Sequence, residues 1–209
     1  KNIKMMSTFL EAIRYNNISQ LVYISSDAVY KDTKNKINEN SKVEPNSIHG
    51  IMHQTRENIL KIFFQKKLTI IRPTLIYGSK DTHNGYGPNK FARNAINNKD
   101  IKIFGNGEEI RDHVHINDVV DLIYNVIKFK SFGIFNAVTS KPTSFVNLAK
   151  LIIKKFKSKS KIVNVKRNGP MPHGGYRCFD RKKIAKRFAN LKPTIIKIGI
   201  NDLKKIKSI

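Results

Sequence analysis

Apolar residues along this 209-residue chain change repeatedly between helix-like and strand-like spacing. Between residues 3 and 13 they recur every three or four positions, which indicates an amphipathic helix, and residues 21–25 then form a short, nearly all-apolar run. A strand of this kind is typical of parallel sheets that are covered by helices on both faces. The same helix–strand unit recurs at 47–65 and 68–78. The pattern therefore predicts an α/β fold built on a doubly wound parallel sheet.

The second half of the chain continues in shorter units, and at this length one compact domain is expected. Short polar side chains accept hydrogen bonds from the free amides of a first helical turn. Asn117 or Asp118 is therefore expected to cap one helix. The same reasoning places Thr143 or Ser144 at the start of the next. The elements expected in this half are helices at 90–98, 116–129, 143–157 and 181–188, and strands at 101–105, 133–138 and 161–165.

The chain is strongly basic, with 40 Lys and Arg against 15 Asp and Glu and a formal charge of +25. Such a charge is typical of proteins that bind nucleic acid, anionic membranes or phosphorylated ligands. The basic residues are scattered, however, and aromatic residues lie inside the apolar runs, so that no stacking platform for single strands is formed. We expect neither nucleic acid nor a membrane as a partner. Affinity for phosphate groups is still expected.

Cysteine usage and hydropathy favour a cytoplasmic protein. Cys178 is the only cysteine, so the chain cannot form an intrachain disulfide, and a reducing compartment fits. No apolar run approaches the length needed to span a bilayer.

Two histidines, His49 and His53, lie four residues apart at the start of the helix predicted at 47–65, which places both rings on one face. Zinc is one interpretation, but the pattern lacks the acidic residue of His-Glu-x-x-His and a third ligand, so we expect no metal. A neutral imidazole is also a competent general base. A third interpretation is that both are solvated residues without a chemical role.

Five stretches, in this order, resemble the extended short-chain dehydrogenase/reductase family of nucleotide-sugar epimerases, dehydratases and reductases. They are LVYISSDAVY (21–30), HGIMH (49–53) where the family has Tyr-x-x-x-Lys, IRPTLIYG (71–78), GNGEEIRDHVHINDV (105–119) and GIFNAVTSKPTSFVNLAKLI (133–152). The resemblance implies a Rossmann-like sheet with a small C-terminal α/β substrate-binding subdomain. It also implies NAD or NADP, a nucleotide-diphosphate sugar, and hydride transfer at a sugar carbon.

The resemblance also divides the chain. Residues 1–80 are expected to be the remaining part of the NAD(P)-binding domain. Residues 81–209 are expected to be mainly substrate-binding, with 113–140 returning to the Rossmann sheet. By analogy with the family, the helix at 47–65 could pair two subunits into a homodimer.

By this resemblance, three residues are candidates for catalysis. Ser26 ends a strand at the carboxyl edge, where parallel sheets place their ligands, and its hydroxyl could bond the reacting oxygen. It could equally cap the strand end. His49 stands where the family's tyrosine takes a proton, and His53 where its lysine binds the cofactor ribose. The His49 imidazole is shorter than a tyrosine, so a bridging water or a shifted substrate would be required. His53 lacks the fixed charge of a lysine but could still donate one hydrogen bond to a ribose hydroxyl.

The remaining candidates also follow from the resemblance, and each has a plain structural alternative, such as a helix cap, an Arg111–Asp112 ion pair or a strand that ends at proline. The residues expected to bind the cofactor are Ser25, His53, Pro73, Thr74 and Leu75, and those expected to bind the substrate are Asp27, Asn89, Lys90, Arg111 and Arg177.

Two departures from the family pattern narrow the function. The 4,6-dehydratases carry an Asp-Glu pair after the Ser or Thr, and this chain has Asp27 followed by Ala28. Epimerisation or carbonyl reduction is therefore expected rather than dehydration. The glycine-rich turn that holds the dinucleotide phosphates is absent from the chain. We therefore expect an N-terminal portion of the sheet outside this chain, which alone would bind NAD or NADP poorly.

The leading hypothesis is thus an NAD(P)-dependent epimerase or reductase. The first alternative is a catalytically silent relative that binds cofactor or sugar nucleotide as a sensor or scaffold. A basic nucleic-acid binder comes third, and its binding would have to survive moderate salt.

Overall fold

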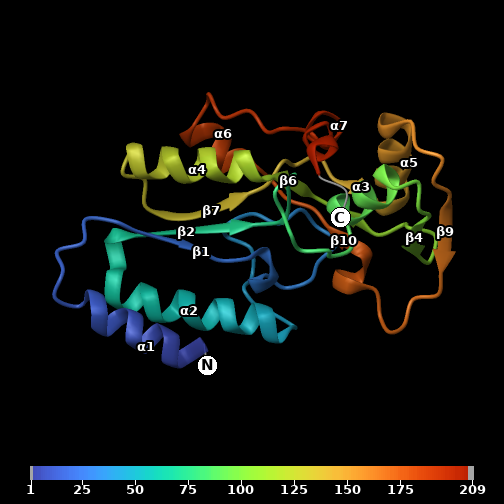
Figure 1. The fold of residues 1–209 in the computed structure, drawn as a ribbon. Helices are drawn as coiled ribbons and strands as arrows, with labels where there is room; N and C mark the ends of the chain where they lie inside the picture. Colours follow the sequence, from blue (N-terminus) through green and yellow to red (C-terminus); the bar gives the residue numbers. More distant parts are fainter. Residues whose placement is uncertain (1, 207–209) are drawn as a thin grey trace.

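The computed structural model describes residues 2–206, and its centre is a small parallel sheet (Figure 1). Helices α1 (Asn2–Ile13) and α2 (Ile48–Phe64) cover one face of the sheet, and α4 (Ile116–Lys128) covers the other (Figure 1). The predicted α/β class with helices on both faces of a parallel sheet is confirmed. The strands, in spatial order, are β1 (Leu21–Ile24), β2 (Leu68–Pro73) and β7 (Gly133–Ala137).

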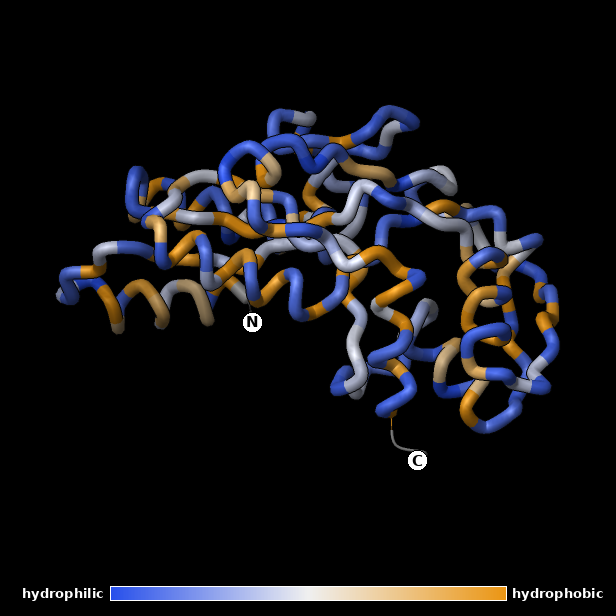
Figure 2. The backbone as a smooth tube through the Cα atoms, turned by 90° about the horizontal axis from the view of Figure 1, so that it is seen from above, coloured by the Kyte–Doolittle hydropathy of each residue, from blue (hydrophilic) through white to orange (hydrophobic). Residues whose placement is uncertain are grey.

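A second group of elements lies beside this sheet, to the right in Figure 2. Its largest apolar cluster joins α3 (Pro88–Ile96) to α5 (Phe145–Phe156). Its strands form small pairs: β3 (Leu75–Tyr77) with β6 (His113–His115), β4 (Ile101–Phe104) with β9 (Ile162–Val165), and β5 (Ile110–Arg111) between β8 (Thr143–Ser144) and β10 (Tyr176–Arg177). The short helices are η1 (Asp27–Val29), η2 (Gln65–Lys67), η3 (Pro172–Gly175), α6 (Lys182–Arg187), α7 (Ile196–Gly199) and η4 (Asp202–Lys205).

The apolar run at 68–78 is divided at Pro73. Proline has no amide hydrogen to donate to a ladder, and β2 ends there. The amide of Thr74 still donates to the carbonyl oxygen of Ala137 on β7, at 3.3 Å. The chain then leaves the central sheet as β3, which pairs with β6. A single apolar run thus serves two sheets, which its periodicity does not reveal.

The helix caps agree with the sequence prediction in one case out of two. The Ser144 hydroxyl caps α5 by accepting a hydrogen bond from the Asn147 amide at 3.3 Å, so that prediction is confirmed. The prediction for α4 is wrong, because β6 runs directly into this helix and His115 is its N-cap. Nδ1 of His115 accepts the hydrogen bond from the Asn117 amide. Asp118 instead accepts two hydrogen bonds from Thr194.

A buried ion pair joins α2 to the central strand. Glu57 and Arg72 are both fully buried, and their two hydrogen bonds measure 2.8 and 2.5 Å. The Ser25 hydroxyl, just after β1, donates to the same carboxylate at 2.6 Å. Burial acts to raise the pKa of Glu57, but the hydrogen bonds and charge of Arg72 outweigh it and hold the pKa below its usual value. The pair therefore links β1, β2 and α2 through one carboxylate.

We expect Arg72→Met to lower the free energy of unfolding by about 3 to 5 kcal/mol, because it leaves the buried Glu57 carboxylate without its countercharge. Urea denaturation followed by circular dichroism measures this. The matched control is Glu44→Gln, which breaks the exposed pairs of Glu44 with Lys31 and Lys42 and should change little. Equal changes in the free energy of unfolding for the two substitutions would show that the buried pair contributes no more to stability than the exposed one.

Candidate active site

Ser25 and Ser26 follow β1 at the carboxyl edge of the sheet, as predicted, and their hydroxyls have different surroundings. Ser25 is buried against Glu57. Ser26 is half-buried and caps η1, because its Oγ accepts a hydrogen bond from the Ala28 amide at 3.2 Å. This bond uses a lone pair of the Ser26 hydroxyl and leaves its hydrogen available to donate.

The first turn of α2 is pressed against η1. Gly50 makes this approach possible, since a Cβ there would overlap the carbonyl oxygen of Ala28 and the ring of Pro45. His49 precedes Gly50, and Ser26 lies two residues before Ala28. The elements that carry Ser26 and His49 are therefore in direct contact at the rim of the sheet.

His49 and His53 lie on the same face of α2, with ring centroids 4.6 Å apart. His49 is exposed, whereas His53 is half-buried and its Nδ1 lies 3.0 Å from the hydroxyl of Tyr23 on β1. Burial, together with the nearby Arg56 and His49, lowers the pKa of His53 to about 4. His53 is therefore neutral near pH 7 and cannot supply the fixed positive charge of a lysine.

The residues expected to contact the cofactor and the diphosphate differ in their burial and in whether their side chains already make hydrogen bonds within the protein. Pro73 and Thr74 are buried at the end of β2, and Leu75 is half-buried at the start of β3. Asn89 is also buried, and its amide group exchanges two hydrogen bonds with the backbone of Gly78. Lys90, next to it in the first turn of α3, is half-buried.

Arg111 lies on β5 and is mostly buried. Its Nε donates to Glu109 at 2.8 Å, and Glu109 also accepts a hydrogen bond from Arg167 at 2.9 Å. The alternative partner from the sequence, Asp112, instead accepts hydrogen bonds from the backbone amides of Thr139 and Ser140. Arg111 is thus paired with an acidic residue, but with Glu109 and not with the adjacent Asp112.

Arg177 is fully buried on β10 and holds the segment that follows β1. Its Nε donates to Asp27 at 3.2 Å and its Nη1 to Asp32 at 3.1 Å. The carbonyl oxygens of Lys31 and Tyr30 accept further hydrogen bonds from its guanidinium. The structure therefore brings together two predicted substrate residues, Asp27 and Arg177, as partners of one another.

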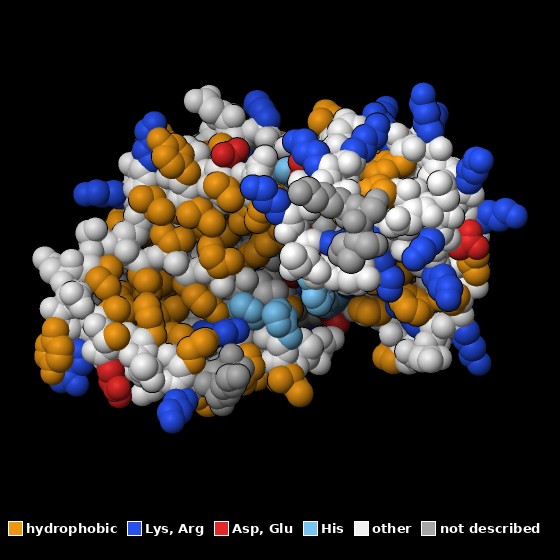
Figure 3. Space-filling view, viewed as in Figure 1, with side chains coloured by type: hydrophobic (Ala, Val, Ile, Leu, Met, Phe, Trp, Pro, Cys, Tyr) orange, Lys and Arg blue, Asp and Glu red, His pale blue; other side chains and the backbone are white. Residues whose placement is uncertain are grey.

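One histidine in this region was not selected from the sequence. His173 in η3 donates from Nδ1 to Asp32 at 2.5 Å, although 141 residues separate the two. Figure 3 shows histidine side chains gathered at the middle of the face, where the start of α2 lies opposite the elements of the second group. A single histidine in a Gly- and Pro-rich loop carries no pattern that could have identified it.

A model of the NAD dependent epimerase/dehydratase family matches residues 1–137. The chain belongs to this family. Among known relatives of this epimerase/dehydratase chain, the uncharacterized UDP-glucose epimerase YtcB of Bacillus subtilis is 28% identical over 129 residues, which cover 60% of the chain and 40% of the relative. The N-acetyl-alpha-D-glucosaminyl-diphospho-ditrans,octacis-undecaprenol 4-epimerase of Escherichia coli O157:H7 is 27% identical over 187 residues, which cover 86% and 54%. The chain spans about half the length of these relatives.

The fold of the epimerase/dehydratase chain is shared with solved structures. UDP-glucuronic acid 4-epimerase from Bacillus cereus, crystallised with UDP-glucuronic acid and NAD, superimposes with a TM-score of 0.87 at 18% identity. The match covers 99% of this chain and 67% of that one. At this identity the likeness concerns the fold.

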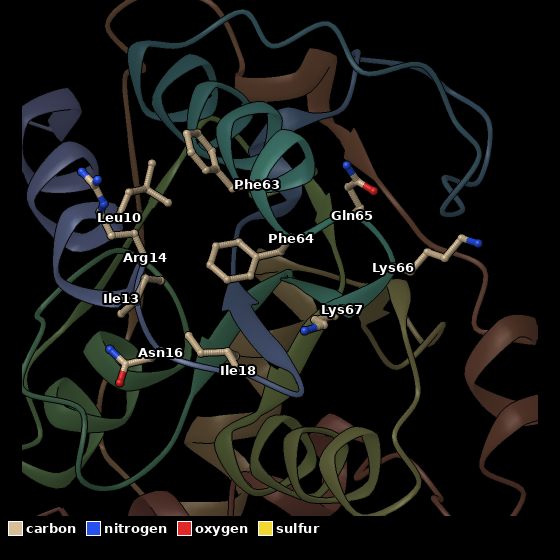
Figure 4. A pocket seen from close by; sticks show the side chains of 10 residues that line it. All are labelled: Leu10, Ile13, Arg14, Asn16, Ile18, Phe63, Phe64, Gln65, Lys66 and Lys67. Atoms are coloured by element: carbon tan, nitrogen blue, oxygen red, sulfur yellow. The ribbon is translucent and has the colours of Figure 1, made fainter.

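A cavity of about 510 Å³ in this family member lies away from the candidate site (Figure 4). It is enclosed by the end of α1 and by η2, near the amino ends of β1 and β2, whereas ligands of parallel sheets bind at the carboxyl ends. Within residues 2–206, no three His, Cys, Asp or Glu side chains are grouped to hold a metal. Over the same residues no helix has the length and hydropathy to cross a membrane.

His113 on β6 is a buried polar residue whose two ring nitrogens have no partner among the described residues. Its ring faces the edge of Phe145, with centroids 5.7 Å apart. Burial, helped by Arg111, lowers the pKa of His113 to about 3. The imidazole therefore stays neutral in the folded chain, and its two unpaired nitrogens reduce stability.

We expect His113→Phe to raise the free energy of unfolding at pH 7 by about 1 to 3 kcal/mol, since it removes two unpaired buried nitrogens. The unfolded chain binds a proton at His113 below about pH 6.5, whereas the folded chain does so only near pH 3. Stability should therefore fall as the pH falls from 6.5 towards 3, and less steeply in the variant. Urea denaturation across this range measures both effects, and parallel curves would contradict the assignment.

Proposed function

We propose that this chain carries the catalytic and sugar-nucleotide-binding part of an NAD(P)-dependent epimerase or reductase. The observation that carries the proposal is the contact between η1 and the first turn of α2 at Gly50. It supports a reaction site between Ser26 and His49, at the carboxyl edge where parallel sheets bind ligands. The names of the family and of its relatives support the substrate class, a nucleotide-diphosphate sugar.

In the proposed reaction the chain's own residues position the sugar and move a proton. The Ser26 hydroxyl donates a hydrogen bond to the reacting oxygen, and the His49 imidazole takes the proton of the sugar hydroxyl as general base. Since an imidazole is shorter than a tyrosine side chain, a water molecule or a shifted sugar bridges the gap. A bound NAD(P) would supply the hydride acceptor for the sugar carbon that bears this hydroxyl.

The residues at the carboxyl ends of β1 and β2 fit one end of such a cofactor. Neutral His53 offers a ring nitrogen to a ribose hydroxyl, while its Nδ1 is held by Tyr23. Ser25 and the segment 73–75 border the same edge. The dinucleotide phosphates need a glycine-rich turn between a strand and a helix, and β1, β2 and β7 are followed by no such turn. The residues of this chain therefore fit only the nicotinamide end of the cofactor.

We propose that a further parallel strand with such a turn pairs along β1. In the described chain β1 pairs only with β2, and its other edge is open. An apolar groove of about 330 Å³ between α1 and β1 follows this edge, and α4, on the other face of the sheet, also exposes Val120 and Tyr124. Hydrophobic side chains cover much of this side of the molecule (Figure 3). Exposed apolar edges are rare in parallel sheets, which supports a covered edge and weak dinucleotide binding by this chain alone.

The remaining assignments are parts of the same proposal. Residues 1–80 and 113–140 serve the cofactor and the other residues serve mainly the substrate, whose diphosphate lies near Lys90 and Arg111. Ala28 in place of a glutamate favours epimerisation or reduction over dehydration. Two copies pair through α2, whose outer face exposes Ile51 and Ile62, and the protein acts in the cytoplasm.

A catalytically silent family member is the second candidate. It is favoured by the neutral state of His53, which leaves position 53 without the positive charge that the family's lysine supplies. Tight binding of NAD or of a sugar nucleotide in calorimetry, with no turnover over a broad panel of nucleotide sugars, would support it.

Activity should depend on His49. In the chain joined to the glycine-rich first unit of a relative, we expect hydride transfer with a nucleotide sugar, measured as nicotinamide absorbance, and His49→Ala should abolish it. The matched control is His83→Ala, at an exposed histidine in the loop before α3, and it should leave the rate unchanged. Full activity of His49→Ala would exclude the proposed general base.

The double substitution His49→Tyr with His53→Lys should leave the rate similar or raise it, because it restores the longer base and the fixed positive charge of the family pattern. The same absorbance assay measures this. If the double variant folds and binds the sugar nucleotide but is inactive, the geometry of Ser26 and residue 49 differs from that proposed.

A further inference from the structure

His173 lies at the junction between the two groups of elements. It is in η3, directly before β10, and β10 pairs with β5 so that Arg177 stands opposite Arg111. Its backbone is left-handed, with a φ of 53°, a conformation that is uncommon for a residue with a Cβ. The His173 side chain is thus held beside the strand pair that carries both arginines.

Asp32 orients this imidazole from the other side. One carboxylate oxygen accepts hydrogen bonds from His173 Nδ1 and Arg177 Nη1, and the other accepts one from Asn46 Nδ2 at 2.5 Å. Asn46 directly precedes Ser47, the N-cap of α2. Asp32 therefore connects His173 to the start of the helix that carries His49.

The second ring nitrogen, Nε2, has no hydrogen-bond partner in the described part of the chain, and 18% of the His173 side chain is exposed. Because a carboxylate only accepts hydrogen bonds, Nδ1 carries the ring proton. In the neutral imidazole Nε2 is then a bare acceptor. A phosphate oxygen is also an acceptor, so the two can bond only when Nε2 gains a proton.

Burial and two nearby arginines disfavour the charged form of His173 in the absence of a ligand. Burial, Arg111 and Arg177 lower its pKa, and Asp32 acts in the opposite direction without cancelling them. A phosphate group beside Arg111 would offset the two positive charges and so favour protonation. Asp32 would then stabilise the imidazolium.

We infer that the His173–Asp32 pair is a proton-taking contact for a phosphate group of the substrate. One proton moves from solvent to Nε2 as the sugar nucleotide binds, and the new N–H donates to a phosphate oxygen. This inference rests on the proposed function, because it assumes a nucleotide-diphosphate sugar in the site. It adds a binding residue and links affinity to pH.

Isothermal titration calorimetry of the chain itself tests this without turnover or cofactor. The probes are UDP-glucose, dTDP-glucose and ADP-glucose, whose phosphates do not titrate near neutral pH. Each is titrated near pH 6.5 in two buffers of different ionisation enthalpy, which gives the number of protons taken up. The variants are His173→Gln and, as the matched control, His83→Gln, and thermal unfolding checks that both are folded.

With the unmodified chain and with His83→Gln, we expect net proton uptake and binding that weakens as the pH rises, by up to about tenfold per pH unit for one proton. His173→Gln should bind more weakly at pH 6.5, with less uptake and a flatter pH dependence. Binding with unchanged uptake in folded His173→Gln would overturn this inference and leave the proposed substrate class standing. Absence of binding for all three probes would overturn both.

Discussion

The buried bond between Glu57 and Arg72 sets the geometry on which the rest of the site depends. Two opposite charges without solvent are stable only while they stay together, so the helix and the strand that carry them cannot move apart. Glu57 lies one turn after His53 on α2, and Arg72 directly precedes Pro73 at the end of β2. The pair therefore fixes the distance between the histidines and the strand end that borders the proposed nicotinamide position. Because Ser25 donates to the same carboxylate, the end of β1 is fixed with them.

This rigid frame makes the exchange of side chains at positions 49 and 53 chemically significant. The backbone of α2 is held at Glu57 by the bond to Arg72 and at Gly50 by its contact with η1, so it cannot shift to compensate for a shorter side chain. In the proposed reaction, the imidazole at position 49 would therefore act through a water molecule or on a sugar bound in a shifted position. At position 53 the main difference from the family's lysine is the missing positive charge, because the His53 ring is neutral. In the proposed site, His49 and His53 thus stand where the resemblance places the family's acid–base pair, with different electrostatics.

Features that depend on neighbouring residues could be predicted from the sequence. The α/β class, the order of the longer helices and of the strands of the central sheet, and a cap at Thr143 or Ser144 follow from local periodicity and from the side chains beside a first turn, whereas the short strands β5, β6, β8 and β10 were not predicted. Contacts between distant segments could not be predicted. Arg177 was expected near the substrate phosphates from a looser part of the resemblance, and its hydrogen bonds to Asp27 and Asp32, about 150 residues earlier, are not indicated by the sequence around it. The His173–Asp32 bond joins two polar loops, and no spacing rule connects residues so far apart.

The large positive charge of the chain says little about the proposed substrate site, because Arg111 and Arg177 are already paired with acidic residues. Arg111 is bonded to Glu109, and Arg177 to two aspartates, so their attraction for an incoming anion is much reduced. Many of the lysines are exposed on helix faces, where salt screens them. The proposed recognition of a diphosphate therefore needs hydrogen-bond donors that have no acidic partner in the free protein. The first turn of α3 offers backbone amides, since its N-cap, Gly87, has no side chain to bond them. A neutral imidazole that gains its charge only beside a phosphate would add a donor without repelling the arginines in the free protein.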